Sequence, residues 1–230
     1  MNMNKRILVL ALVCAPVAAL AHKGGALRLG VSETHVGMAS ASANMPGLQI
    51  GVGGMYHGVD IRAGVSYARG AGASLETFGV RATANPRAAL SPYASLGMID
   101  LADLSGATTT TNYQVNAGGL ITPTTTTTDL PVRGVVMGDG LVGLRARLDL
   151  NPRWSLAAHA GIGAGFGGST TGLPAVGGGR SPFATSVGAS LQYRVTPHAV
   201  AALTYTREVI PVRGATFRRE GVALTMARTF

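Results

Sequence analysis

Larger apolar residues alternate with small or polar residues along much of the chain, with a period of two. Between residues 183 and 195 the odd positions are mostly apolar or aromatic, and the even positions are small or polar. The segments 59–67, 144–150 and 154–162 follow the same pattern. Because successive side chains of a β-strand point to opposite faces, the alternation predicts strands with one apolar face and one small or charged face.

Turn-forming residues separate the alternating segments and set the expected strand boundaries. The shorter connections are 57–58, 85–89, 151–153 and 196–198, and the longer ones are 44–46, 69–73, about 105–137, 165–182 and 211–216. Between them the sequence predicts ten strands, at 34–43, 47–56, 59–69, 74–84, 91–104, 138–150, 154–164, 183–195, 199–210 and 217–230. The pattern is weakest at 34–43, and residues 26–33 are an alternative place for part of that strand.

The order of the connections favours one architecture. Shorter and longer connections alternate, which is typical of bacterial outer-membrane barrels with short periplasmic turns and longer external loops. We therefore predict an all-β fold, a transmembrane antiparallel up-and-down β-barrel of about 10 strands, with eight as the alternative. Residues 22–230 are expected to form this single domain, with a Thr-rich external loop at about 105–137. The strands of a secreted soluble β-sandwich also alternate, but their apolar faces point inward. Whether the apolar faces point inward or outward therefore decides between the two folds.

Aromatic and charged positions favour the barrel over the sandwich. Tyr56, Trp154 and Tyr193 fall near expected strand ends, where the membrane interfaces would lie. Charged residues share the face opposite the apolar one, and Arg81 is expected on the same face as Glu76. In a lumen such charges can pair, whereas an Arg exposed to lipid at mid-depth costs roughly 2–4 kcal/mol. The expected lumen-lining residues are Asp60, Arg62, Glu76, Arg145, Arg147, Asp149, His159, Arg194 and Glu208.

The composition agrees with a barrel and excludes two other classes of protein. The 230 residues include 33 glycines and only 13% charged residues, against about 7% glycine and roughly 25% charged residues in an average soluble domain. A hydrophobic content of 47% argues against a disordered chain. The single cysteine, Cys14, argues against a disulfide-stapled domain. Small residues let strands curve and fill a narrow lumen.

Residues 1–21 have the pattern of a secretory signal peptide. Lys5 and Arg6 precede an apolar core at 7–13, and Ala19-Leu20-Ala21 forms a small-x-small cleavage site. This apolar core is shorter than the roughly 20 apolar residues that a transmembrane helix needs. The sequence therefore predicts export, with cleavage after Ala21, and localisation in the outer membrane.

The last predicted strand ends in an aromatic residue. Val222, Leu224, Met226 and Phe230 share one face, and this pattern resembles the C-terminal recognition signal of bacterial outer-membrane barrels. Arg228 departs from that signal, because an apolar or aromatic residue usually stands there, although an Arg at the interface can snorkel. The resemblance implies that the outer-membrane barrel assembly machinery is a partner.

The order of segments between residues 35 and 230 also resembles the YfaZ-type family of small outer-membrane proteins. One shared feature is a Gly-Leu-x-Ile strand at 47–50. Another is a strand that begins with Gly-Leu at 143, is followed by a turn with a proline at 152, and precedes a strand that begins with the aromatic residue Trp154. The third is a terminal Val-x-Leu strand that ends in Phe230. The resemblance implies an outer-membrane location and a barrel fold, and it carries over no catalytic residue.

The sequence offers one candidate for catalysis. Small outer-membrane barrels include lipid A-modifying enzymes, which need an oriented base beside a nucleophile. His159 is the one histidine expected at mid-strand on the polar face, with Ser155 and Ser190 as conceivable partners, and a hydrogen-bonded lumen histidine is the more common case. The sequence has no HExxH or GxSxG motif and no metal-spaced cluster. We expect no catalytic site, metal or cofactor, with a lipid A-modifying enzyme as the alternative.

The net charge of +9 points to anionic partners. Arg binds phosphate groups bidentately, so arginines in external loops are candidates to contact outer-membrane lipid and lipopolysaccharide, or else remain solvated. These candidates are Arg69, Arg133, Arg180, Arg213, Arg218 and Arg219. Nucleic acid is not an expected partner, because this exported chain lacks a basic–aromatic stripe. We expect a barrel with a structural or narrow-pore role, and the Thr-rich loop suggests a surface adhesin as a further alternative.

Overall fold

The computed structural model describes residues 25–38, 41–115, 121–132, 134–167, 183–212 and 215–230. The regular elements of these residues are all strands, and none of these residues belongs to a helix long and apolar enough to cross a membrane. The strands are β1 (Ala26–Met38), β2 (Ala41–Tyr56), β3 (Val59–Gly70), β4 (Ala73–Ala84), β5 (Leu90–Ala102), β6 (Leu104–Val115), β7 (Ile121–Val132), β8 (Val135–Asp149), β9 (Trp154–Gly167), β10 (Ala184–Thr196), β11 (Ala199–Val212) and β12 (Ala215–Thr229).

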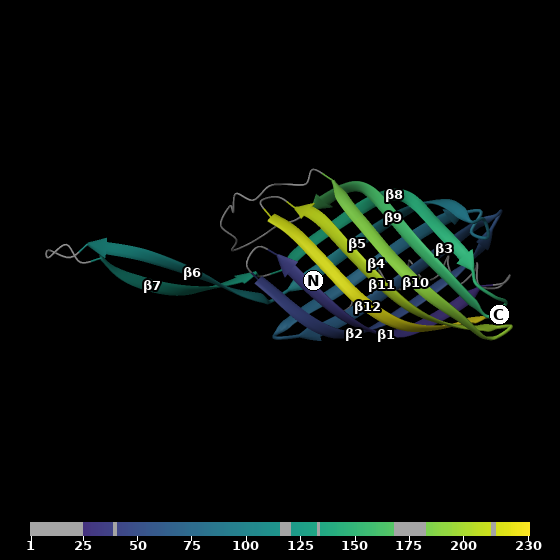
Figure 1. Ribbon diagram of the computed structural model, residues 1–230, viewed down its shortest axis with the longest axis horizontal. Helices are drawn as coiled ribbons and strands as arrows, with labels where there is room; N and C mark the ends of the chain where they lie inside the picture. Colours follow the sequence, from purple (N-terminus) through teal and green to yellow (C-terminus); the bar gives the residue numbers. More distant parts are fainter. Residues whose placement is uncertain (1–24, 39–40, 116–120, 133, 168–182, 213–214) are drawn as a thin grey trace, which may run out of the picture.

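Ten of the strands close into one antiparallel barrel (Figure 1). Consecutive strands pair within β1 to β5 and within β8 to β12, β5 pairs with β8, and β1 pairs with both β2 and β12. Because the wall closes on itself, its backbone hydrogen-bonding groups are satisfied within the protein. The structure confirms the predicted ten-stranded barrel and rules out the eight-stranded barrel and the β-sandwich.

The two ends of the barrel differ. At one end the chain turns at 57–58, 85–89, 150–153 and 197–198, and the C-terminus lies at the same end (Figure 1). We call this the short-turn end. The strands β6 and β7 extend beyond the opposite end, which we call the hairpin end (Figure 1).

The turns at the two ends are more alike than the sequence predicts. Residues 69–73, predicted as a longer connection, contain a two-residue turn at Ala71 and Gly72, with φ of 50° and 82°. His57 and Gly58 at the short-turn end have φ of 47° and 82°. Both turns therefore have the positive φ angles that a two-residue type I′ hairpin turn requires. The strict alternation of connection lengths is wrong, although it led to the correct number of strands in the barrel.

The predicted Thr-rich loop contains two strands. β6 and β7 pair along their whole length and project from the hairpin end as a two-stranded ribbon (Figure 1). Threonines stand opposite one another along the ribbon, from Thr108 opposite Thr128 to Thr111 opposite Thr125. Threonine is β-branched and favours an extended backbone. The segment therefore forms strands although its sequence does not alternate between apolar and polar residues.

Large apolar side chains cover the outside of the barrel. Leu48, Leu96 and Val142, on three different strands, are 66%, 63% and 63% exposed. Soluble monomers rarely expose contiguous apolar patches of more than a few hundred Å². An apolar outside combined with small or polar inward residues is typical of barrels that span a membrane. We call this outer surface the apolar belt.

Near the hairpin end the two faces of the barrel wall exchange character. In β1 the outward residues change from the apolar Leu29 and Val31 to the exposed Glu33. The inward residues change in the opposite sense, from Ser32 to the fully buried Val36. On β1 to β5, β11 and β12 the hairpin end is therefore built like a water-soluble barrel, with polar residues outside and apolar residues inside, whereas on β8 and β9 the exposed Val136 and Phe166 keep the outside apolar. Its outward polar residues, which we call the polar collar, are Glu33, His35, Asn44, Arg69, Glu76, Asp100, Arg207, Arg218 and Glu220.

Two interactions join neighbouring strands within the polar collar. His35 Nδ1 and Asn44 Oδ1 are 2.7 Å apart and share a hydrogen bond between β1 and β2. Arg207 and Glu220 form an ion pair of 3.1 Å between β11 and β12. Polar pairs of this kind are stable on a surface that water reaches, whereas in lipid each charge would carry a desolvation cost. The polar collar is therefore suited to lie outside the hydrocarbon layer.

Two glycines make room for a large side chain inside the barrel. Tyr93 of β5 is 4% exposed, and it stands opposite Gly143 of β8, which in turn stands opposite Gly161 of β9. A Cβ atom on Gly161 would collide with the Tyr93 hydroxyl group, and a Cβ atom on Gly143 would lie 2.8 Å from the Tyr93 ring. The ring therefore lies across two strands that carry no side chain at that level.

We expect Gly161→Ala to lower the free energy of unfolding by about 1–3 kcal/mol, because the new methyl group overpacks the lumen against Tyr93. In a Tyr93→Phe background the cost should fall, since the hydroxyl group that the methyl group meets is gone. Gly79→Ala is the matched control, because its Cβ atom would meet only a backbone oxygen at 3.7 Å. Urea unfolding in lipid vesicles measures all four variants. Equal losses for Gly161→Ala in both backgrounds would contradict this packing.

Candidate functional site in the barrel lumen

Apolar side chains fill the lumen near the hairpin end. Phe217, Met45 and Leu101 are fully buried there, and they come from three different strands. We call this set the apolar plug. Its members are Val36, Met38, Ala41, Ala43, Met45, Ala68, Ala73, Leu75, Ile99, Leu101, Leu104, Val135, Met137, Ile210, Val212 and Phe217. The sequence predicted a small or charged inward face, and this part of the lumen differs because its inward side chains are apolar and buried against one another as in a soluble core.

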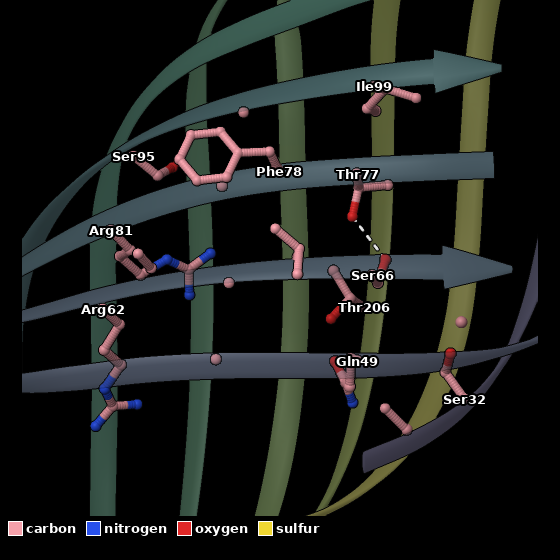
Figure 2. Close-up of a pocket in the computed structure, with 18 of the residues that line it drawn as sticks. Ser32, Gln49, Arg62, Ser66, Thr77, Phe78, Arg81, Ser95, Ile99 and Thr206 are labelled. Carbon is pink, nitrogen blue, oxygen red and sulfur yellow. Dashed lines mark hydrogen bonds between the residues drawn. The ribbon is translucent and has the colours of Figure 1, made fainter. Parts of the chain in front are cut away.

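A polar cavity of about 420 Å³ lies next to the apolar plug, farther from the hairpin end. Ser66 of β3 and Thr77 of β4 face it, and their hydroxyl groups share a hydrogen bond of 2.6 Å (Figure 2). Figure 2 also shows Gln49 and Thr206 beside this pair, with Arg62 at the other side of the cavity. The lumen therefore changes from a dry, apolar section to a section that can hold water.

Buried charges mark the boundary between the apolar plug and the cavity. Glu208 is 7% exposed and forms an ion pair of 2.7 Å with Arg219. Asp139 is 3% exposed and interacts electrostatically with both. A Cβ atom on Gly97 would collide with the Asp139 carboxylate, so the glycine leaves space for it. A buried ion pair is costly to break because each partner would be left unpaired.

Four arginines gather toward the short-turn end of the cavity. Arg28, Arg62, Arg81 and Arg145, from β1, β3, β4 and β8, line a second cavity of about 190 Å³. We call them the arginine cluster. Figure 2 shows Arg62 and Arg81 side by side on neighbouring strands, and the register places them directly opposite each other. Like charges directly opposite each other on a sheet destabilise the pair.

Each arginine of the cluster has a different environment. Arg62 forms an ion pair of 2.6 Å with Asp60. Arg145 donates a hydrogen bond of 3.2 Å to the backbone oxygen of Pro86, and the Arg81 guanidinium lies 4.6 Å from the centre of the Tyr93 ring. In the described part of the chain, Arg28 has no ion pair or hydrogen bond to its guanidinium group. The cluster thus carries four positive charges and one directly paired carboxylate.

Most of the predicted lumen charges point inward, and one does not. The strand register directs the following predicted side chains toward the lumen: Asp60, Arg62, Arg145, Arg147, Asp149, His159, Arg194 and Glu208. Arg147 pairs with Asp149 at 2.8 Å near the short-turn end. Glu76, also predicted in the lumen, is instead outward, opposite Tyr67 and Asp100 in the polar collar.

The arginines predicted to contact lipopolysaccharide do not form one group. Arg69 and Arg218 are exposed on the outside at the hairpin end. Arg219 points into the lumen and pairs with Glu208, because β12 already begins at Ala215 and successive residues alternate between faces. The remaining candidates lie outside the described residues: Arg133, Arg180 and Arg213.

His159 lies beside the arginine cluster, on the wall of the smaller cavity. Its ring makes an edge-to-face contact with Tyr93, with 5.9 Å between the ring centres. Its Nε2 atom is buried without a hydrogen-bond partner among the described residues. Ser190, a predicted partner, instead accepts a hydrogen bond of 3.4 Å from Gln192. The histidine is therefore placed to meet something that enters the cavity.

Metal-ligating side chains do not gather anywhere in the described part of the chain, where no three His, Cys, Asp or Glu residues come close enough to hold a metal ion.

Comparisons with known proteins show the fold and no family. No protein-family model and no curated protein matches the chain. Among solved structures, the outer membrane protease OmpT from Escherichia coli is similar over 90% of this chain and 97% of its own, with a TM-score of 0.52 and 8% identity. This likeness shows the fold of an outer-membrane barrel.

Two other solved structures cover the chain with lower TM-scores. Neisserial surface protein A covers 90% of this chain and 97% of its own, with a TM-score of 0.44 and 10% identity. The translocator domain of the autotransporter NalP from Neisseria meningitidis covers 99% and 98%, with a TM-score of 0.44 and 11% identity.

Proposed function

We propose that this protein is an integral outer-membrane β-barrel with a structural role, whose lumen conducts no large solutes. The observation that carries the proposal is a closed barrel with an apolar belt outside and an apolar plug inside. The belt provides the surface that lipid requires. The apolar plug occupies the lumen at the hairpin end, and barrels of about this size have interiors that side chains can fill.

The orientation follows from the two ends of the barrel. Barrels of the outer membrane place their short turns in the periplasm and their longer segments outside the cell. We therefore place the short-turn end in the periplasm, and the polar collar with the β6–β7 ribbon outside. A signal peptide at 1–21 with cleavage after Ala21 is part of this proposal, since the chain must cross the inner membrane.

The partners of this barrel would be lipid and the assembly machinery. Val222, Leu224 and Met226 are exposed on the outer face of β12, and Phe230 is 67% exposed beyond its end. The Arg228 guanidinium lies 5.8 Å from the centre of the Phe230 ring, which supports the interfacial position proposed for Arg228. Among the arginines of the polar collar, Arg69 and Arg218 are the described candidates for lipopolysaccharide phosphates.

A catalytic role on lipid A has less support than the structural role. His159 lies toward the short-turn end, and the apolar plug fills the lumen between it and the outer leaflet. A family relation to the YfaZ type stays a proposal. The features behind it lie in β2, in β8 to β9 and in β12, which are all part of the barrel wall.

Two measurements test the proposed function. An outer-membrane fraction should yield a protein that dissolves only with detergent and migrates differently after boiling, because a closed barrel resists unfolding by detergent alone. In planar bilayers the purified barrel should show no wide, stable channel. Solubility without detergent would contradict the membrane location, and a wide, stable channel would contradict the closed lumen.

A further inference from the structure

The arginine cluster is electrostatically incomplete. The charges of Arg62, Arg81 and Arg145 all repel that of Arg28, and among the described residues Asp60 is the group that attracts it. Arg62 and Arg81 stand directly opposite each other, an arrangement that costs free energy wherever no anion lies between them. The wall of a closed barrel fixes the backbone positions of the four arginines, so the strands that carry them cannot move apart as segments of a flexible loop would.

The neutral groups of the cavity are also suited to an anion. Besides the arginines, the wall of the 190 Å³ cavity carries Ser190, Gln192, Thr204 and Thr225, which all have hydrogen-bond donors. The His159 Nε2 atom is buried on the same wall without a partner among the described residues. A protonated or neutral imidazole can donate from this atom.

We propose that the arginine cluster binds a phosphate group inside the lumen. A phosphate group has several acceptor oxygens, and guanidinium groups recognise it with paired N–H donors. The cavity of about 190 Å³ is of a size for a small anion rather than for a polymer. The site lies on the short-turn side of the apolar plug, so the ligand belongs to the compartment at the short-turn end. This inference goes beyond the structural role and does not require the barrel to conduct.

Variants of the arginine cluster can separate phosphate binding from a purely structural role, because the two roles predict different changes in the stability of the unliganded barrel. Without ligand, Arg28→Gln removes a charge that three others repel, so the variant barrel should be at least as stable as the wild type. With ligand, the same variant loses charge-assisted hydrogen bonds to phosphate and should bind at least about tenfold more weakly. Arg81→Gln should lose binding in the same way, whereas its stability without ligand also reflects the lost contact between Arg81 and the Tyr93 ring. Arg147→Gln is the control, because Arg147 pairs with Asp149 outside the cavity.

The experiment measures thermal unfolding of the full barrel in an uncharged maltoside detergent. Potassium phosphate and glycerol phosphate are titrated separately against potassium chloride at constant ionic strength. We expect a saturable rise of the wild-type unfolding temperature with at least one of the two phosphates and none with chloride. A response to inorganic phosphate alone assigns the site to the free ion, and a response to glycerol phosphate assigns it to phosphate esters.

Three results would overturn the proposal. The first is a wild-type barrel that responds to neither phosphate beyond the response to chloride. The second is an Arg147→Gln barrel that loses the response as fully as Arg28→Gln does. The third is an unliganded Arg28→Gln barrel that unfolds more easily than the wild type, because the arginines would then be stabilised by groups of the protein itself.

Discussion

Replacing Phe217, Met38 and Met45 together by alanine is expected to open the lumen and produce channels in planar bilayers. All three side chains are fully or almost fully buried in the apolar plug, and Phe217 stands opposite Met38 between β12 and β1. Their removal should leave a cavity beside β12, β1 and β2, and we expect this cavity to join the polar section of the lumen to the hairpin end. Because the barrel wall is held by its own backbone hydrogen bonds, we expect it to survive the loss of these side chains.

Stability gives a second measure of the same packing. Phe217→Ala alone should lower the free energy of unfolding by about 3–5 kcal/mol, the usual cost of emptying a buried phenylalanine site. The matched control is Phe166→Ala, because Phe166 is 50% exposed on the outer face of β9. That variant should lose much less stability and form no channel. A triple variant that folds as a barrel and remains closed would show that groups other than the apolar plug close the lumen.

Alternation alone was enough to predict most of the barrel wall. From β3 to β12 each barrel strand overlaps a predicted strand, since the apolar belt requires apolar residues at every second position. The β6–β7 ribbon was missed, because threonines on both faces produce no alternation. Their β-branched side chains are the available clue that this segment forms strands.

The boundaries of β1 and β2 could not be predicted from alternation as those of the other barrel strands could. In β1 the apolar positions are odd up to Val31 and even from Val36, because the apolar belt ends and the apolar plug begins. A pattern that changes parity within one strand resembles two short strands with a turn between them. In β2 the same change occurs around Pro46, which was predicted as part of a connection. The proline is tolerated because pairing of β2 with β3 begins only at Gly47.

Whether two residues of a strand are an odd or an even number of positions apart also decides which lumen residues could be predicted. Glu76 and Arg81 are five residues apart, so a regular strand places them on opposite faces, and the ladders of β4 run without a bulge on both sides. Glu76 therefore joins the polar collar and Arg81 joins the arginine cluster. Arg28 was missed because the first strand was expected to begin at 34. The convergence of four arginines from four strands depends on the register of the closed barrel, which no single segment contains.

The exchange of faces near the hairpin end predicts how far the lipid layer reaches along the outside of β2. Ile50 and Asn44 both point outward on this strand, Ile50 within the apolar belt and Asn44 within the polar collar. Ile50 stands between Leu29 and Val65, which also face outward. Ile50→Arg should reduce the stability of the inserted barrel by about 2–4 kcal/mol, the cost of an arginine near the middle of the bilayer.

Asn44→Arg places the same side chain on the same strand and the same face, six positions away, and should cost no more than about 1 kcal/mol because water reaches the polar collar. Reversible folding into vesicles under urea measures both variants, and Ile50→Ala controls for the loss of the isoleucine itself. If both arginine variants are destabilised equally, the bilayer extends to the hairpin end and the collar lies in lipid. The charges of the collar make the opposite result the expected one, since Glu33, Glu76 and Asp100 would otherwise face hydrocarbon.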